Sequence, residues 1–134
     1  MEAGARVCIS DINEKNGETT LDELKNIFGQ DRVHFVPCDV TKTDDLRTLF
    51  DETEKFFNVS CIDILVNNAG INVNFGWKKC LDVNIMAVIN GTEIAMDRMK
   101  KVDKQCQIIS TASAGNCVYR LINPNREVFG ICLS

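Results

Sequence analysis

The sequence contains a single histidine, His34, and no pair of cysteines spaced Cys-x-x-Cys. Its seven cysteines are scattered singly, so the usual ligand spacings of a zinc site are missing and an odd count opposes a complete disulfide framework. Several cysteines lie in or beside apolar runs, where a reduced thiol packs as a small hydrophobic side chain. We therefore predict no metal site, reduced cysteines in the core and a reducing, cytoplasmic environment.

Long apolar runs and basic clusters are also missing. No segment approaches the length of a membrane span, and no basic stretch followed by an apolar stretch opens the sequence as a secretory signal would. The formal net charge is −4 and the pI is about 5.0. An acidic protein of this kind is not expected to have nucleic acid or an anionic membrane surface as its main partner.

Apolar segments of strand length alternate with segments of helical periodicity, without repeats or low-complexity stretches. At 134 residues the chain has the size of one domain or part of one. Strands separated by helices are typical of parallel β-α-β units, because parallel neighbours need a long crossover. The sequence therefore predicts a doubly wound α/β sheet. The expected strands are residues 6–10, 33–38, 62–66 and 106–110, and the expected helices are residues 14–28, 41–57 and 77–99.

Polar residues follow the expected strands at their carboxyl ends. Asp11 follows the first strand, Asp39 the second, Asn67 to Gly70 the third, and a segment rich in Ser and Thr up to Ser113 the fourth. Ordinary turns also contain such residues. Because the carboxyl ends of parallel strands meet at one edge, where α/β proteins bind ligands, the four positions together favour a binding cleft.

The motif Asn67-Asn68-Ala69-Gly70 directly after an apolar strand is the most specific of these features. Asn and Gly tolerate unusual backbone conformations and let a chain pass close beneath a flat ligand. Together with Asp11, Asp39-Val40, Asn84 and Ser113 in this order, the motif resembles the short-chain dehydrogenase/reductase family. The resemblance runs from about Ala3 to Gly115, and residues 63–77 and 88–92 resemble the branch of NAD-dependent 15-hydroxyprostaglandin dehydrogenases and their invertebrate relatives.

The resemblance implies a Rossmann-like cleft for NAD. In it, Asp11 would accept hydrogen bonds from the ribose hydroxyls of the adenosine, and its charge would repel the 2′-phosphate of NADP. Asp39 and Val40 would lie along the adenine, while Asn67, Ala69 and Gly70 would line the cofactor. A capping role at the start of the following helix is the alternative for Asp11 and Asp39, and it is compatible with cofactor binding.

The resemblance also implies catalytic roles for two residues. Asn84 would hold a water molecule in the active site, and Ser113 would hydrogen-bond the substrate oxygen during hydride transfer. We expect Asn84 to be buried in its helix, where an interhelical hydrogen bond is the alternative role. For Ser113 the alternative is an ordinary turn, and the segment before Gly115 is one residue shorter than the family pattern.

Two elements of the family pattern do not appear in the sequence. The glycine-rich turn that holds the pyrophosphate is missing before the strand at 6–10. At the other end, Tyr119 is followed four residues later by Asn123 rather than Lys, and no Lys occurs after Lys104. We therefore expect an incomplete Rossmann-like sheet without its first strand and its C-terminal part: a partial NAD-binding domain at residues 1–115 and a divergent tail at residues 116–134.

The missing first strand would lie between the strands at 6–10 and 62–66. Both neighbours would then have open edges unless the sheet closes up or another chain covers them. By resemblance, the activity would be NAD-dependent oxidation of a secondary alcohol, such as a hydroxyprostaglandin or another lipid alcohol, to a ketone. One alternative is a non-catalytic variant that binds dinucleotide weakly or associates with a full-length subunit through the helices at 41–57 and 77–99, the faces by which the family commonly pairs. The other is a product without function. A homodimer is the expected partner arrangement by resemblance.

Overall fold

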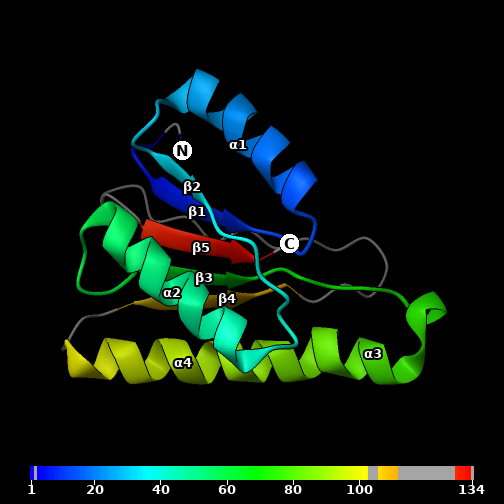
Figure 1. The fold of residues 1–134 in the computed structure, drawn as a ribbon. Coiled ribbons are helices and arrows are strands. Elements are labelled where there is room, and N and C mark those ends of the chain that lie inside the picture. The colour runs from blue at the N-terminus through cyan, green and yellow to red at the C-terminus, as the bar shows by residue number, and fades with distance from the viewer. Residues whose placement is uncertain (2, 103–105, 112–128, 134) are drawn as a thin grey trace.

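The computed structural model describes residues 1, 3–102, 106–111 and 129–133 (Figure 1). In this part of the chain, strands and helices alternate up to β4, as the sequence predicts. A 3₁₀ turn at Val73–Phe75 precedes α3, and a π-helical turn at Asp82–Met86 joins α3 to α4. The strands are β1 (Arg6–Ser10), β2 (Val33–Phe35), β3 (Ile64–Asn67), β4 (Gln107–Ser110) and β5 (Phe129–Leu133); the helices are α1 (Glu14–Phe28), α2 (Thr43–Phe57), α3 (Trp77–Leu81) and α4 (Ala87–Lys101).

The strands form one sheet in the order β2-β1-β5-β3-β4, and every neighbouring pair is parallel (Figure 1). The predicted parallel α/β fold is thus confirmed. No strand was expected at residues 129–133, yet β5 lies between β1 and β3, where open edges were expected. Its register places Cys132 beside Ile9 on one side and Val66 on the other.

The helices cover both faces of the sheet. Neighbouring residues of β2 show this directly, because successive side chains of a strand point to opposite faces. The His34 ring stacks on Phe56 of α2, with ring centroids 4.1 Å apart. The Phe35 ring lies against Gly17 of α1. Since α2 also packs on α4, α1 covers one face and α2 with α4 the other.

The ends of the first two helices show how local hydrogen bonds set their bounds. Asn13 caps α1 by accepting a hydrogen bond from the Asn16 N–H, and Gly29 ends it with φ at 105°. The second helix was expected from residue 41, but α2 begins at Thr43, and Lys42 precedes it without a side-chain cap. The Thr41 hydroxyl instead donates to the Asp39 carboxylate at 2.7 Å.

The core lies mainly between the sheet and the helices α2 and α4. Leu46, Leu49 and Phe50 of α2 are fully buried. Burial raises the pKa of the Cys8 thiol to about 12 and that of Cys38 to about 11. These two thiols stay protonated at neutral pH and pack as apolar side chains, as predicted. Other core residues include Phe57, Cys61, Ile62, Leu65, Val83, Ala87, Ile94, Ala95 and Met99.

The helical segment from α3 to α4 is only partly buried. A row of large apolar side chains along it faces solvent, with exposed fractions of 66% for Trp77 and 50% for Ile85. Spacings of four and seven residues place them on one side of the helices. We call this row the apolar stripe; it consists of Trp77, Leu81, Ile85, Ile89 and Met96.

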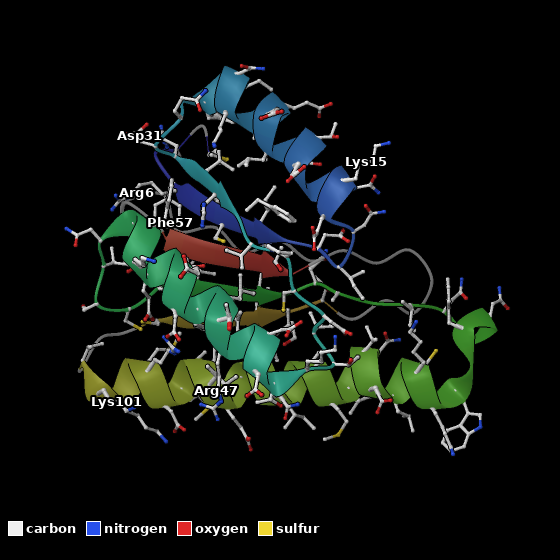
Figure 2. The ribbon with its side chains drawn as sticks, in the orientation of Figure 1. Arg6, Lys15, Asp31, Arg47, Phe57 and Lys101 are labelled. Atoms are coloured by element: carbon white, nitrogen blue, oxygen red, sulfur yellow. The ribbon has the colours of Figure 1, made fainter. Side chains whose placement is uncertain are left out.

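Ion pairs join α4 to α2 across a groove of about 480 Å³. Arg98 donates to the Glu54 carboxylate at 2.7 Å and to Asp51 at 2.6 Å. Arg47 on α2 and Lys101 on α4 line the same groove (Figure 2). Burial raises the pKa of Glu54 despite the neighbouring guanidinium. None of the described helices is both long and apolar enough to cross a membrane.

Candidate cofactor cleft

The carboxyl ends of four strands meet at one edge of the sheet, as the sequence predicts. Ser10 at the end of β1 pairs with Leu133 of β5, which pairs with Asn67 of β3, and Asn67 pairs with Ser110 of β4. Asp11 follows this row directly. The arrangement brings the polar residues of the sequence motifs to a single rim, with the end of β5 between the β1 side and the β3 side.

Asp11 lies half-buried on the β1 side of the rim. Its carboxylate accepts a hydrogen bond of 2.7 Å from the Asn13 backbone N–H, which holds it in a turn just before α1. Asn13, not Asp11, is the helix cap. The Asp11 carbonyl also accepts from the Cys38 N–H at 3.2 Å, so the segments after β1 and β2 are tied together.

Asp39 lies beside Asp11 through this tie and borders a hollow of about 320 Å³. Its carboxylate accepts from both the hydroxyl and the backbone N–H of Thr41, and these bonds lower its pKa. The Lys42 ammonium nitrogen lies 3.6 Å from the Asp39 carboxylate. Val40, by contrast, is 8% exposed and packs in the core, so its side chain supports the rim from below. Ile12, Glu14, Pro37, Cys38, Asp45 and Thr48 complete the hollow.

Asn67 points its side chain into the protein rather than into the cleft. It is 2% exposed, and its amide nitrogen donates weakly to Thr92 on α4 and Ser110 on β4, at 3.3 and 3.4 Å. Its backbone carbonyl accepts from the Thr111 N–H at 3.0 Å. Gly91 approaches so closely that an added Cβ would lie 3.0 Å from the Asn67 side-chain oxygen. Asn67 therefore fixes the strand end from beneath.

Asn84 holds the chain that leaves the Asn67–Gly70 motif. Its side-chain oxygen accepts from the Ile71 N–H at 2.9 Å, and its side-chain nitrogen donates to the Ile71 carbonyl at 2.8 Å. The expected burial of Asn84 is wrong, because its residue is exposed. Ala69 is half-buried against the core, and Gly70 is exposed beside Asn84, which leaves the backbone accessible.

Two residues considered in the sequence lie outside the part of the chain that the structure describes. Ser113 and Tyr119 belong to residues 112–128, which the structure does not describe. Sequence reasoning missed the partners that position the rim, namely Ile71 for Asn84 and Ser110 for Asn67. No local pattern marks them, since each contact joins residues far apart in the chain. The described residues contain no cluster of His, Cys, Asp or Glu suited to a metal ion.

Comparison with known proteins identifies the family that uses this arrangement. The family described as short chain dehydrogenase matches residues 1–122. The chain belongs to the short-chain dehydrogenase family. A 15-hydroxyprostaglandin dehydrogenase [NAD(+)] from Bos taurus is 37% identical over 98 residues, which are 73% of this chain and 36% of that protein.

Relatives within the family differ in cofactor and substrate. An NADP-dependent (R)-specific alcohol dehydrogenase from Lentilactobacillus kefiri is 34% identical over 121 residues, covering 84% of this chain and 46% of its own. The crystal structure of a short chain dehydrogenase from Mycobacterium smegmatis shares 33% identity with a TM-score of 0.74, covering 83% of this chain and 48% of that one. The chain thus spans less than half the length of these relatives.

Proposed function

We propose that the rim between β1 and β4 binds NAD and that the chain belongs to an oxidoreductase acting on secondary alcohols. The carboxylate of Asp11 at the end of β1 carries this proposal. It is half-buried, its orientation is fixed by Asn13, and it lies beside the hollow next to Asp39. Such a carboxylate accepts hydrogen bonds from two ribose hydroxyls and disfavours a 2′-phosphate.

The residues on the β3 side suit the nicotinamide end of the cofactor. Gly70 has no side chain, and Asn84 holds the following backbone by two hydrogen bonds, so a flat ring can approach this segment closely. Ser113 is the proposed hydrogen-bond donor to the substrate oxygen, and Asn84 remains a proposed positioning residue. NAD held at this rim would supply the hydride acceptor for oxidation of an alcohol, such as a lipid alcohol of the hydroxyprostaglandin kind, to a ketone, and the hydroxyl proton would leave to solvent.

Calorimetric titration of the chain with NAD and NADP tests the cofactor proposal. We expect saturable binding with a preference for NAD, and we expect Asp11→Ala to weaken NAD binding by about tenfold, the loss of roughly 1.4 kcal/mol. Asn13→Ala is the matched control, because it removes the side chain that caps α1 while keeping the carboxylate. A folded chain that binds neither dinucleotide contradicts the proposal.

A second candidate function is binding without turnover, with two subunits pairing through α3 and α4. The exposed apolar stripe favours it, since contiguous apolar surface of this kind is typical of an interface. Asn123 also favours it, because it stands four residues after Tyr119, where the family pattern has Lys. Formation of NADH with secondary alcohols separates the two candidates: turnover supports the first, and binding without turnover the second.

A further inference from the structure

Strand β5 lies at the centre of the sheet, between β1 and β3. A strand at the centre must pair along both of its edges, and β5 does so with all five residues against β1 and with four against β3. Its main contacts in the fold are these two strands, whereas β1 and β3 each also pack against helices. We call the space between β1 and β3 the strand slot.

The walls of the strand slot are joined to each other without β5. On the β1 side, β1 pairs with β2 and contacts α1 on one face of the sheet and α2 on the other. On the β3 side, β3 pairs with β4 and packs under α4. The two sides are connected by the packing of α2 on α4 and by the pairs from Arg98 to Asp51 and Glu54. The two walls of the slot are therefore held together by contacts that do not involve β5, and β5 fills the space between them.

An empty slot would leave two facing rows of backbone N–H and C=O groups. Such rows pair with any extended segment of suitable sequence, and an identical segment from another copy makes the same contacts. The chain between β4 and β5 comprises residues 111–128 and can span up to roughly 60 Å when extended. That reach is longer than the slot and allows β5 to enter a neighbouring copy.

The surface gives two copies a reason to remain together. The apolar stripe on α3 and α4 is exposed in a single copy, and a second copy would cover it. We propose that the strand slot is an acceptor site for an extended strand, and that two copies of this chain exchange their β5 segments through it. The partner is thus a second copy of the chain, and its ligand is the segment Phe129–Leu133.

The register supplies a covalent test. Paired residues of adjacent strands lie close to 4.8 Å apart, which is within the Cα separation of a disulfide. Ile9 is the register partner of Cys132, so Ile9→Cys introduces a cysteine at the position paired with Cys132. Oxidised glutathione serves as the oxidant: two thiols lose their protons and two electrons to form the disulfide, and the glutathione disulfide is reduced to two thiols.

The decisive experiment mixes two chains during refolding. One chain carries Ile9→Cys with Cys132→Ser, and the other is the native chain with Ile9 and Cys132. Exchange predicts a covalent dimer after oxidation, in which the peptide map joins the thiol introduced at position 9 of the variant to Cys132 of the native chain. Mass spectrometry of the cross-linked peptides excludes disulfides formed by the other cysteines.

The other outcomes overturn the proposal. A chain with Ile9→Cys alone that forms only an intrachain disulfide, together with a mixture that forms no covalent dimer, shows that β5 stays in its own copy. Val66→Cys repeats the test from the β3 wall, because Val66 is the other partner of Cys132. Failure of both variants to cross-link to Cys132 while remaining folded shows that the segment does not occupy the slot.

Discussion

Asn84 and Ile71 meet through two hydrogen bonds, with the side-chain amide of Asn84 satisfying both the N–H and the C=O of Ile71. The contact joins the π-helical turn before α4 to the chain after the Asn67–Gly70 motif. Both polar atoms of the Asn84 side chain are engaged by the backbone. The residue therefore holds this segment in place, and we propose that it acts on the cleft in this way.

Asn84→Ala removes both hydrogen bonds. We expect the free energy of unfolding to fall by only about 1 kcal/mol, because the contact is exposed to solvent. The free energy of NAD binding should fall by more than this. Asn84→Asp keeps the acceptor for the Ile71 N–H and should have an intermediate effect. Chemical denaturation and calorimetry measure the two quantities, with Asn26→Ala on the exposed face of α1 as the control. Unchanged NAD binding in Asn84→Ala argues against the positioning role.

Arg98→Ala tests the connection between α2 and α4. The side chains of Arg98 and Glu54 are 20% and 16% exposed, so removal of the guanidinium leaves a largely buried carboxylate without its partner. We expect the free energy of unfolding to fall by about 2 kcal/mol. The partner Asp51 is 66% exposed, and Asp51→Ala should cost less than about 1 kcal/mol because water screens that pair. Equal losses for both variants would contradict this account.

The imidazole of His34 should make the stability of the folded chain depend on pH. Burial against Phe56 lowers the pKa of its imidazole below the ordinary 6.5, although Glu52 opposes the shift. The folded state thus disfavours the charged ring, so its stability contribution is complete above pH 6.5 and is lost as the pH falls through the lowered pKa. As the only histidine, it can be followed by NMR titration. Phe56→Leu should move the pKa back toward 6.5, and a native pKa at or above 6.5 contradicts the prediction.

Gly17 and Gly70 should respond differently to alanine. At Gly17 the new methyl group would meet the Phe35 ring, whose Cδ2 atom lies 2.8 Å from the position that an added Cβ would take, so the ring must move. We expect a loss of about 1–3 kcal/mol in unfolding free energy and partial recovery in the double variant with Phe35→Leu. At Gly70 the nearest atom is 3.7 Å away, and Gly70→Ala should fold normally. Thermal denaturation compares the three variants.

The sequence was sufficient for the parts of the fold that depend on local patterns. Apolar runs and helical periodicity predicted β1, α1, β3 and β4 to within a few residues, because each buries a face defined by its own side chains. The rim followed from the rule for parallel sheets, which needs only the order of strands and helices. The family motif then singled out Asp11 and the Asn67–Gly70 segment.

The contacts that the sequence did not reveal all depend on more than the local pattern of apolar residues. Asn84 was expected to be buried, but the helix turns this residue outward, where it finds the Ile71 backbone. The helix expected from residue 41 begins at Thr43, and the Thr41 hydroxyl bonds to the Asp39 carboxylate before it. The central strand β5 has five residues with no alternating polar pattern, and only the open edges of β1 and β3 give it a place.

The central position of β5 also has a consequence for synthesis of the protein. Residues in β1 pair with β5, which is synthesised more than a hundred residues later, and β3 pairs with the same late segment. The edges of β1 and β3 that face each other therefore lack β5 until residues 129–133 have left the ribosome. Pairing between such distant segments is slow, and unpaired strand edges are prone to aggregate until the partner strand has been made.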